Sequence, residues 1–188
     1  GDVNGTGVFT IAAPNGNTNR TLVLPDSAGT ILTTATAGVP IGGPAFSAWQ
    51  SNGSANQSIS SDVWTKAKID TEEFDTNSNF DTSTYRFTPN VAGYYQVNGC
   101  LYLRNGSASA LKIISLYKNG SLYKSGISLY LTGNYYTAAD NFNVSSLVYL
   151  NGSTDYVELY AYIASSAATI GYGITASYFN AAMVRSAT

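Results

Sequence analysis

Residues 146–163, SLVYLNGSTDYVELYAYI, carry the clearest structural signal in the chain. After the Asn151-Gly152 pair, aliphatic side chains alternate with a second set that is tyrosine at every position except Glu158. Because neighbouring side chains of a strand point to opposite faces, this pattern predicts a strand with an aliphatic core face and a tyrosine-rich face. Asn-Gly suits a type I′ turn, so residues 146–150 and 156–163 are predicted to pair as a hairpin. The aliphatic set is Val157, Leu159, Ala161 and Ile163.

Similar turn signals recur along the chain. Asn-Gly occurs seven times, and residues 111–117 and 122–123 on either side of Asn119-Gly120 predict a second hairpin. No long segment shows a 3.6-residue period, so short strands with regularly spaced turns favour an all-β sandwich or barrel.

Composition narrows the class of protein. Only 11% of the 188 residues are charged, and Asn, Ser, Thr, Gly and Tyr supply most of the polarity, which is typical of extracellular or particle-borne β proteins. The net charge is −2 and the nine Lys and Arg residues are scattered, so a nucleic-acid partner is not expected. No apolar run approaches the roughly 20 residues of a membrane-spanning helix, so membrane insertion is not expected either.

Catalytic residue types are sparse. Histidine is absent, which excludes Ser-His-Asp and Cys-His nucleophiles and His-ligated metals. Six of the eleven acidic residues lie between Asp62 and Asp81, and we interpret them as a solvated acidic loop between early strands. Calcium is a conceivable ligand of such a loop, and a glycosidase-type carboxylate pair is an alternative. We predict a non-enzymatic protein without a metal or cofactor, in which the single Cys100 is a small buried core residue.

The first 40 residues differ from the rest. Very short apolar segments at 8–11, 21–25 and 29–32 are separated by polar turns, and 35–43 is rich in Gly and Ala. Alone they bury too little to stand as a domain, so several chains are needed to form a stalk. We predict a β-rich stalk and linker over 1–40 and a globular head over 41–188.

The head resembles a known family. Residues 86–97, RFTPNVAGYYQV, resemble the core pattern of the complement 1q globular domain, within the tumour-necrosis-factor-like superfamily. Phe87, Gly93 and Tyr95 fit this signature, while Val97 and Gly99 stand where aromatic residues are common. Residues 44–48 resemble its opening strand, and 177–184, with Phe179, its closing strand. The resemblance implies a jelly-roll β-sandwich that assembles as a homotrimer.

The stalk resembles something different. Residues 9–14, 21–26 and 29–32 are similar to a segment of phage tail-fibre proteins. Together with a complement 1q-like head, this segment predicts the tip of a phage tail fibre, located on the virion and outside the cell. The tip is expected to bind a host cell-surface receptor, expected to be a glycan, or only to trimerise the fibre. A secreted complement 1q-like recognition protein of a cellular organism is the first alternative. A fibre-borne glycan hydrolase is the second.

Two sets of residues are candidates for contacts. The tyrosine-rich face predicts a subunit interface, because tyrosine is enriched at interfaces, or else it lines an outer sheet face. A Tyr- and Asn-rich segment predicts receptor contact, because aromatic rings with nearby amides suit sugar rings, or else it packs under a loop. The interface set is Tyr156, Tyr160 and Tyr162, and the receptor set is Asn105, Tyr130, Asn134, Tyr135 and Tyr136.

Overall fold

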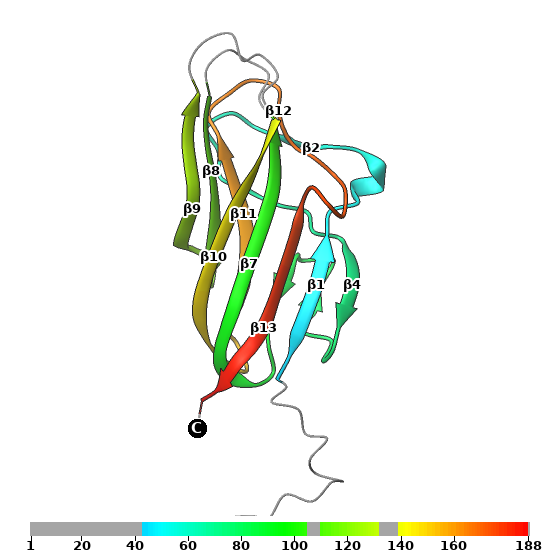
Figure 1. Cartoon of the computed structure of the whole chain (residues 1–188), viewed down its shortest axis with the longest axis vertical. Helices are drawn as coiled ribbons and strands as arrows, with labels where there is room; N and C mark the ends of the chain where they lie inside the picture. Colours follow the sequence, from blue (N-terminus) through cyan, green and yellow to red (C-terminus); the bar gives the residue numbers. More distant parts are fainter. Residues whose placement is uncertain (1–42, 105–109, 132–138, 188) are drawn as a thin grey trace, which may run out of the picture. The chain divides into compact units, whose positions relative to one another are not determined.

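The computed structural model describes residues 43–104, 110–131 and 139–187. These residues fold into two antiparallel β-sheets, with one 3-10 turn (Asn52–Ser54) and no α-helix among them. In Figure 1 the strands β10, β7, β13 and β1 lie side by side in one layer, and β9, β8 and β11 belong to the other. The predicted stalk over residues 1–40 lies outside the described residues.

The first sheet has seven strands, and β7 is its longest together with β10. β7 pairs with β10 along one edge and with β13 along the other, and β13 continues the sheet to β1 and β4. The strands are β1 (Ala45–Trp49), β2 (Gln57–Ile59), β4 (Thr71–Asp75), β7 (Ala92–Arg104), β10 (Ala139–Asn151), β12 (Ala168–Ile170) and β13 (Tyr178–Ser186).

The second sheet has six strands in the order β5-β6-β11-β8-β9, and β3 pairs with β11. The strands are β3 (Thr65–Lys66), β5 (Phe80–Asp81), β6 (Arg86–Phe87), β8 (Ala110–Lys118), β9 (Ser121–Leu131) and β11 (Val157–Ile163). Strands that follow one another in the sequence therefore belong to different sheets at several points. The all-β jelly-roll fold predicted from the sequence is confirmed.

One predicted hairpin is confirmed and the other is wrong. β8 and β9 pair across Asn119 and Gly120, whose φ angles of 53° and 77° are those of a type I′ turn. Residues on either side of Asn151-Gly152 do form strands, but β10 pairs with β7 whereas β11 pairs with β8 in the other sheet. Here the Asn151 side chain accepts hydrogen bonds from the backbone amides of residues 153, 154 and 155, which shapes a wider connection between layers.

The core fills the space between the sheets. The aliphatic set of β11 is 0–1% exposed, as its alternation predicted. The aromatic centre is built on Phe46, whose ring lies 4.6 Å from Phe87 and 5.2 Å from Phe179. Tyr95 packs edge-on against Phe87 at 5.5 Å and donates its hydroxyl to the carbonyl oxygen of Val91 at 2.6 Å. The family-signature aromatics therefore lie together in one core.

The acidic segment is more ordered than a solvated loop. Glu72, Glu73 and Asp75 belong to the edge strand β4, so the loop prediction is wrong there. Asp70 accepts the backbone amides of residues 51 and 52 at 2.6 and 2.9 Å, and Asp81 accepts four hydrogen bonds from Ser83 and Thr84. Such side chains shape turns by accepting backbone amides.

Candidate functional site

Of the predicted interface tyrosines, Tyr160 and Tyr162 lie on the outer face of β11, and Tyr156 lies just before this strand. Tyr156, Tyr160 and Tyr162 are all half-buried. The ring of Tyr160 stacks on Tyr117 of β8 at 3.9 Å, and Tyr162 lies 5.3 Å from the ring of Trp64. The tyrosine face is thus an aromatic cluster built largely with partners from the same chain.

A buried carboxylate sits among these tyrosines. Glu158 is 1% exposed, and its Oε1 accepts hydrogen bonds from Lys66 Nζ at 2.7 Å and from Arg86 Nε at 2.6 Å. The hydrogen bond to Glu158 raises the pKa of the Arg86 guanidinium, which also lies 4.2 Å above the ring of Tyr156. A buried carboxylate needs such partners, so Lys66 and Arg86 are fixed over this part of the face.

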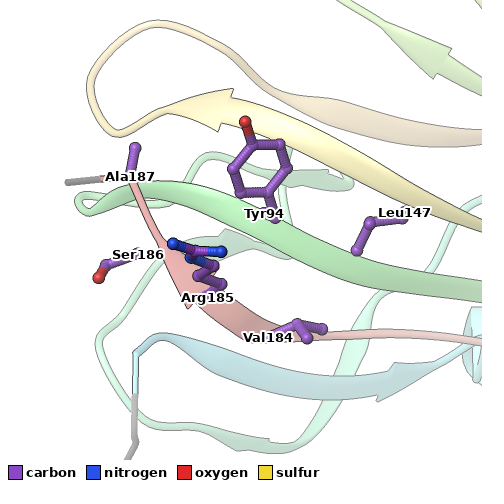
Figure 2. A pocket seen from close by; sticks show the side chains of 6 residues that line it. All are labelled: Tyr94, Leu147, Val184, Arg185, Ser186 and Ala187. Carbon is purple, nitrogen blue, oxygen red and sulfur yellow. The ribbon is translucent and has the colours of Figure 1, made fainter.

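The open face of the first sheet exposes apolar side chains on the neighbouring strands β7, β10 and β13. Tyr94 and Tyr149 are directly paired across β7 and β10, with rings 5.5 Å apart. Leu147 and Val184 extend this apolar patch and are 52% and 55% exposed. Figure 2 shows Tyr94, Leu147 and Val184 around a shallow hollow whose other wall is residues 185–187 of β13 and its end.

A polar row continues the same face beyond the apolar patch. Asn98 on β7 accepts from Ser145 of β10 at 2.8 Å and donates to Asn180 of β13 at 3.0 Å. Gln96 donates to Ser145 at 2.8 Å. The amides are therefore hydrogen-bonded across three strands, and the charged groups beside the apolar patch are Arg185 and Lys118, whose Nζ donates to the Tyr149 carbonyl oxygen at 2.8 Å.

Sequence reasoning missed this face, although a signal was present. Tyr94 and Gln96 alternate with Tyr95 and Val97, so on a strand the two pairs of side chains point to opposite faces. Of the predicted receptor residues, the structure places Tyr130 near the end of β9, where it is 64% exposed. Asn105, Asn134, Tyr135 and Tyr136 lie outside the described residues.

The described residues contain no group of three or more Cys, Asp and Glu residues that could hold a metal ion. Burial raises the pKa of the Cys100 thiol, which is 3% exposed and lies 3.6 Å from the carbonyl oxygen of Ala176. Within the same ranges, no helix is long and apolar enough to cross a membrane.

The strand order and core define a jelly-roll sandwich of the complement 1q and tumour-necrosis-factor type. The globular domain of the zebrafish complement 1qA protein is similar at a TM-score of 0.51 and 16% identity, over 77% of this chain and 99% of that one. Murine APRIL is similar at 0.54 and 8% identity, over 76% of this chain and 99% of that one. Eiger TNF from S. frugiperda is similar at 0.54 and 11% identity, over 78% and 96%.

These likenesses establish the fold. No sequence model of a protein family matches the chain, and no curated protein matches it.

Proposed function

We propose that this chain is a homotrimeric recognition domain that binds a cell-surface receptor. The observation that carries the homotrimer is the apolar patch on the open sheet face, and the receptor role rests on the resemblance of the sequence to complement 1q heads and tail-fibre segments. Exposed apolar patches on soluble proteins mark interaction sites, and Tyr94 and Tyr149 are of the residue type enriched at interfaces. Domains of this fold type are recognition or ligand domains that act as trimers.

Two faces are candidates for the contact between subunits. The tyrosine face of residues 156–162 supplies aromatic area, but its tyrosines are half-buried against their own chain. The apolar patch is freer, because the side chains of Leu147 and Val184 are more than half exposed. We favour the patch as the contact between copies, and the tyrosine face remains the competing proposal.

The biological setting we propose is the tip of a phage tail fibre. Its support is the sequence of residues 9–32 alone, which resembles fibre segments that precede a receptor-binding tip. On this proposal the head is displayed on the virion, and Tyr130 with the predicted loop residues contributes to the receptor contact. A secreted complement 1q-like protein of a cellular organism fits the fold equally well and is the alternative.

Two observations separate these proposals. The gene containing this chain, read with its neighbours, is expected to lie among virion structural genes. A signal peptide or collagen-like Gly-x-y repeats upstream would instead support the secreted protein. The full chain, labelled and applied to a glycan array, is expected to bind a subset of glycans, and complete silence would leave trimerisation as its role.

A further inference from the structure

A basic cleft lies on the side of the second sheet, between β3, β6 and the turn that precedes β6. Its volume of about 520 Å³ falls within the range of about 300–1,000 Å³ typical of small-ligand sites. Three of the nine Lys and Arg residues of the chain line it, although the chain as a whole is acidic. The lining residues are Gln57, Thr65, Lys66, Lys68, Ser83, Thr84, Tyr85 and Arg86.

The two lysines are held in position by the fold. Ala67 and Ile69 are each 1% exposed, so the alternate residues Lys66 and Lys68 share the opposite, outward face. The buried Gln57 side chain donates to the Lys66 carbonyl oxygen at 2.8 Å and accepts the Lys68 amide at 2.9 Å. The backbone that carries both charges is therefore fixed before any ligand arrives.

The cations keep donors available. Lys66 Nζ bonds Glu158 Oε1 at 2.7 Å and the Thr84 carbonyl oxygen at 3.2 Å, while Arg86 reaches Glu158 through Nε only. The two terminal nitrogens of Arg86 form no hydrogen bond or ion pair with the described residues. The same is true of Lys68 Nζ. Planar guanidinium donors of this kind suit carboxylate and sulfate oxygens.

The local charge stays positive after the nearby carboxylates are counted. Glu158 lies beneath Lys66 and Arg86, and its second oxygen, Oε2, is buried without a hydrogen-bond partner in the described structure. The Asp81 carboxylate accepts hydrogen bonds from Ser83 and Thr84, which hold its pKa well below the usual range. Three cations therefore face two carboxylates, and neither carboxylate lines the cleft.

The hydroxyl groups of the cleft favour a sugar over a bare anion. Ser83 Oγ and Thr84 Oγ1 donate to Asp81 at 2.6 and 2.8 Å, and Thr65 Oγ1 donates to the Val63 carbonyl oxygen at 3.2 Å. With their protons committed, these oxygens can only accept from a ligand. Saccharide hydroxyls can donate to them, whereas sulfate or a carboxylate has no donor at neutral pH.

An aromatic ring completes the cleft. Tyr85 has a φ of 57°, in the left-handed region that bulky residues rarely adopt, and its amide donates to the Asp81 carbonyl oxygen at 2.6 Å. Such outliers cluster at ligand-binding positions. A half-buried tyrosine ring beside charged and accepting groups is a surface on which a sugar ring can pack.

We propose that this cleft binds an acidic saccharide, one whose charge is a carboxylate or a sulfate ester. The inference rests on the proposed recognition function and names the chemical class of its receptor. Arg86 and Lys68 receive the anionic group, the three committed hydroxyls accept from sugar hydroxyls, and Tyr85 packs on the ring. Because the charges are solvent-accessible, binding weakens as ionic strength rises.

The test is calorimetric titration of the full chain with matched sugars. The probes are an oligogalacturonate and its neutral methyl ester, and a sulfated lactosamine and its unsulfated form, with inorganic sulfate alongside. Either acidic saccharide is expected to bind better than its neutral match and better than sulfate alone. Whichever acidic form binds identifies the charged group. Equal binding of acidic and neutral forms, or sulfate binding as tightly as the saccharide, would overturn the proposal.

Matched variants locate the site. Lys68→Gln is expected to weaken acidic-sugar binding about three- to tenfold, and Lys124→Gln, an exposed lysine on β9 that does not line the cleft, is expected to leave it unchanged. Equal effects of the two variants, or none at Lys68, would overturn the cleft. If the acidic sugars fail while the chain still binds other glycans, only this inference fails. Silence toward every glycan would remove the receptor function as well.

Discussion

Gly99 on β7 lies directly against Leu159 on β11, so closely that a Cβ atom on residue 99 would overlap the Leu159 side chain. The two residues belong to opposite sheets. The sequence resemblance to complement 1q heads predicts an aromatic residue at position 99, but with glycine there the Leu159 side chain occupies the space beside the β7 backbone. The glycine therefore allows close contact between the two layers.

Substitution of this glycine tests the contact. Gly99→Ala is expected to lower the free energy of unfolding by about 1–3 kcal/mol, because overpacking a dense core forces neighbouring side chains out of position. Leu159→Ala alone is expected to cost about 2–5 kcal/mol through the cavity it leaves. Denaturant unfolding of the double variant should show a cost below the sum of the two. Additive costs would mean that the two side chains do not compete for one space.

Val184 tests which face joins the subunits. Val184→Asp places a charge in the apolar patch, so burial between copies would require desolvating three carboxylates. The concentration at which the trimer dissociates is expected to rise about a hundredfold or more. Sedimentation of the full chain measures this, with circular dichroism to check that the fold is retained.

Tyr162→Ser on the tyrosine face is the matched comparison. It is expected to leave the association state unchanged, because Tyr162 contacts Trp64 and donates to Asp62 at 3.0 Å within its own chain. Dissociation by this substitution but not by Val184→Asp would select the tyrosine face. A wild-type chain that sediments as a folded monomer would contradict the homotrimer itself.

Asp155 ties the connection between β10 and β11 to the β8–β9 turn. It accepts Asn119 Nδ2 at 2.8 Å and Lys118 Nζ at 3.0 Å. Burial raises its pKa, but hydrogen bonds from Asn119 and Lys118 and the lysine charge lower it by more, so the net pKa is below its ordinary value. A carboxyl with a lowered pKa in the folded state stabilises the fold above its unfolded pKa of about 3.9. This contribution is lost as the pH falls through the folded pKa.

Asp155→Asn is therefore expected to be less stable than wild type by about 1–3 kcal/mol at neutral pH. The difference should narrow as the pH falls below about 4, where the wild-type carboxyl takes up its proton. Unfolding midpoints in urea, measured from neutral to acidic pH, provide the curve. A constant difference across this range would show that the loss does not come from the ionised carboxylate.

The strand content was readable from sequence, but the pairing was only partly so. Asn119-Gly120 joins strands of one sheet, while Asn151-Gly152 carries the chain from one sheet to the other. The dipeptide is the same, and the difference lies in the added residues 153–155, whose amides bond to the Asn151 side chain. A local signal predicts that the chain turns, whereas the partner of a strand is set by distant residues.

The candidate sites were less accessible to sequence reasoning for the same reason. The basic cleft joins Lys66 and Lys68 to Arg86, and the buried Glu158 that holds two of them is far along the chain. Alternation places Glu158 on the same strand face as the neighbouring tyrosines, but it does not show what covers that face. That β3 and the residues before β6 cover this face follows from tertiary packing, which periodicity does not report.

Tyr130 tests the proposed receptor contact on β9. It is 64% exposed, and its side chain makes no ring contact or hydrogen bond with the other described residues, so Tyr130→Ala is expected to change the free energy of unfolding by less than about 0.5 kcal/mol. If its ring packs on a receptor sugar, the substitution should weaken glycan or cell-surface binding roughly tenfold. Tyr123→Ala, at the other end of the same strand and 38% exposed, is the control and should bind as wild type. Equal binding by wild type and both variants, measured with the full chain on one glycan array, would place the receptor contact elsewhere on the head.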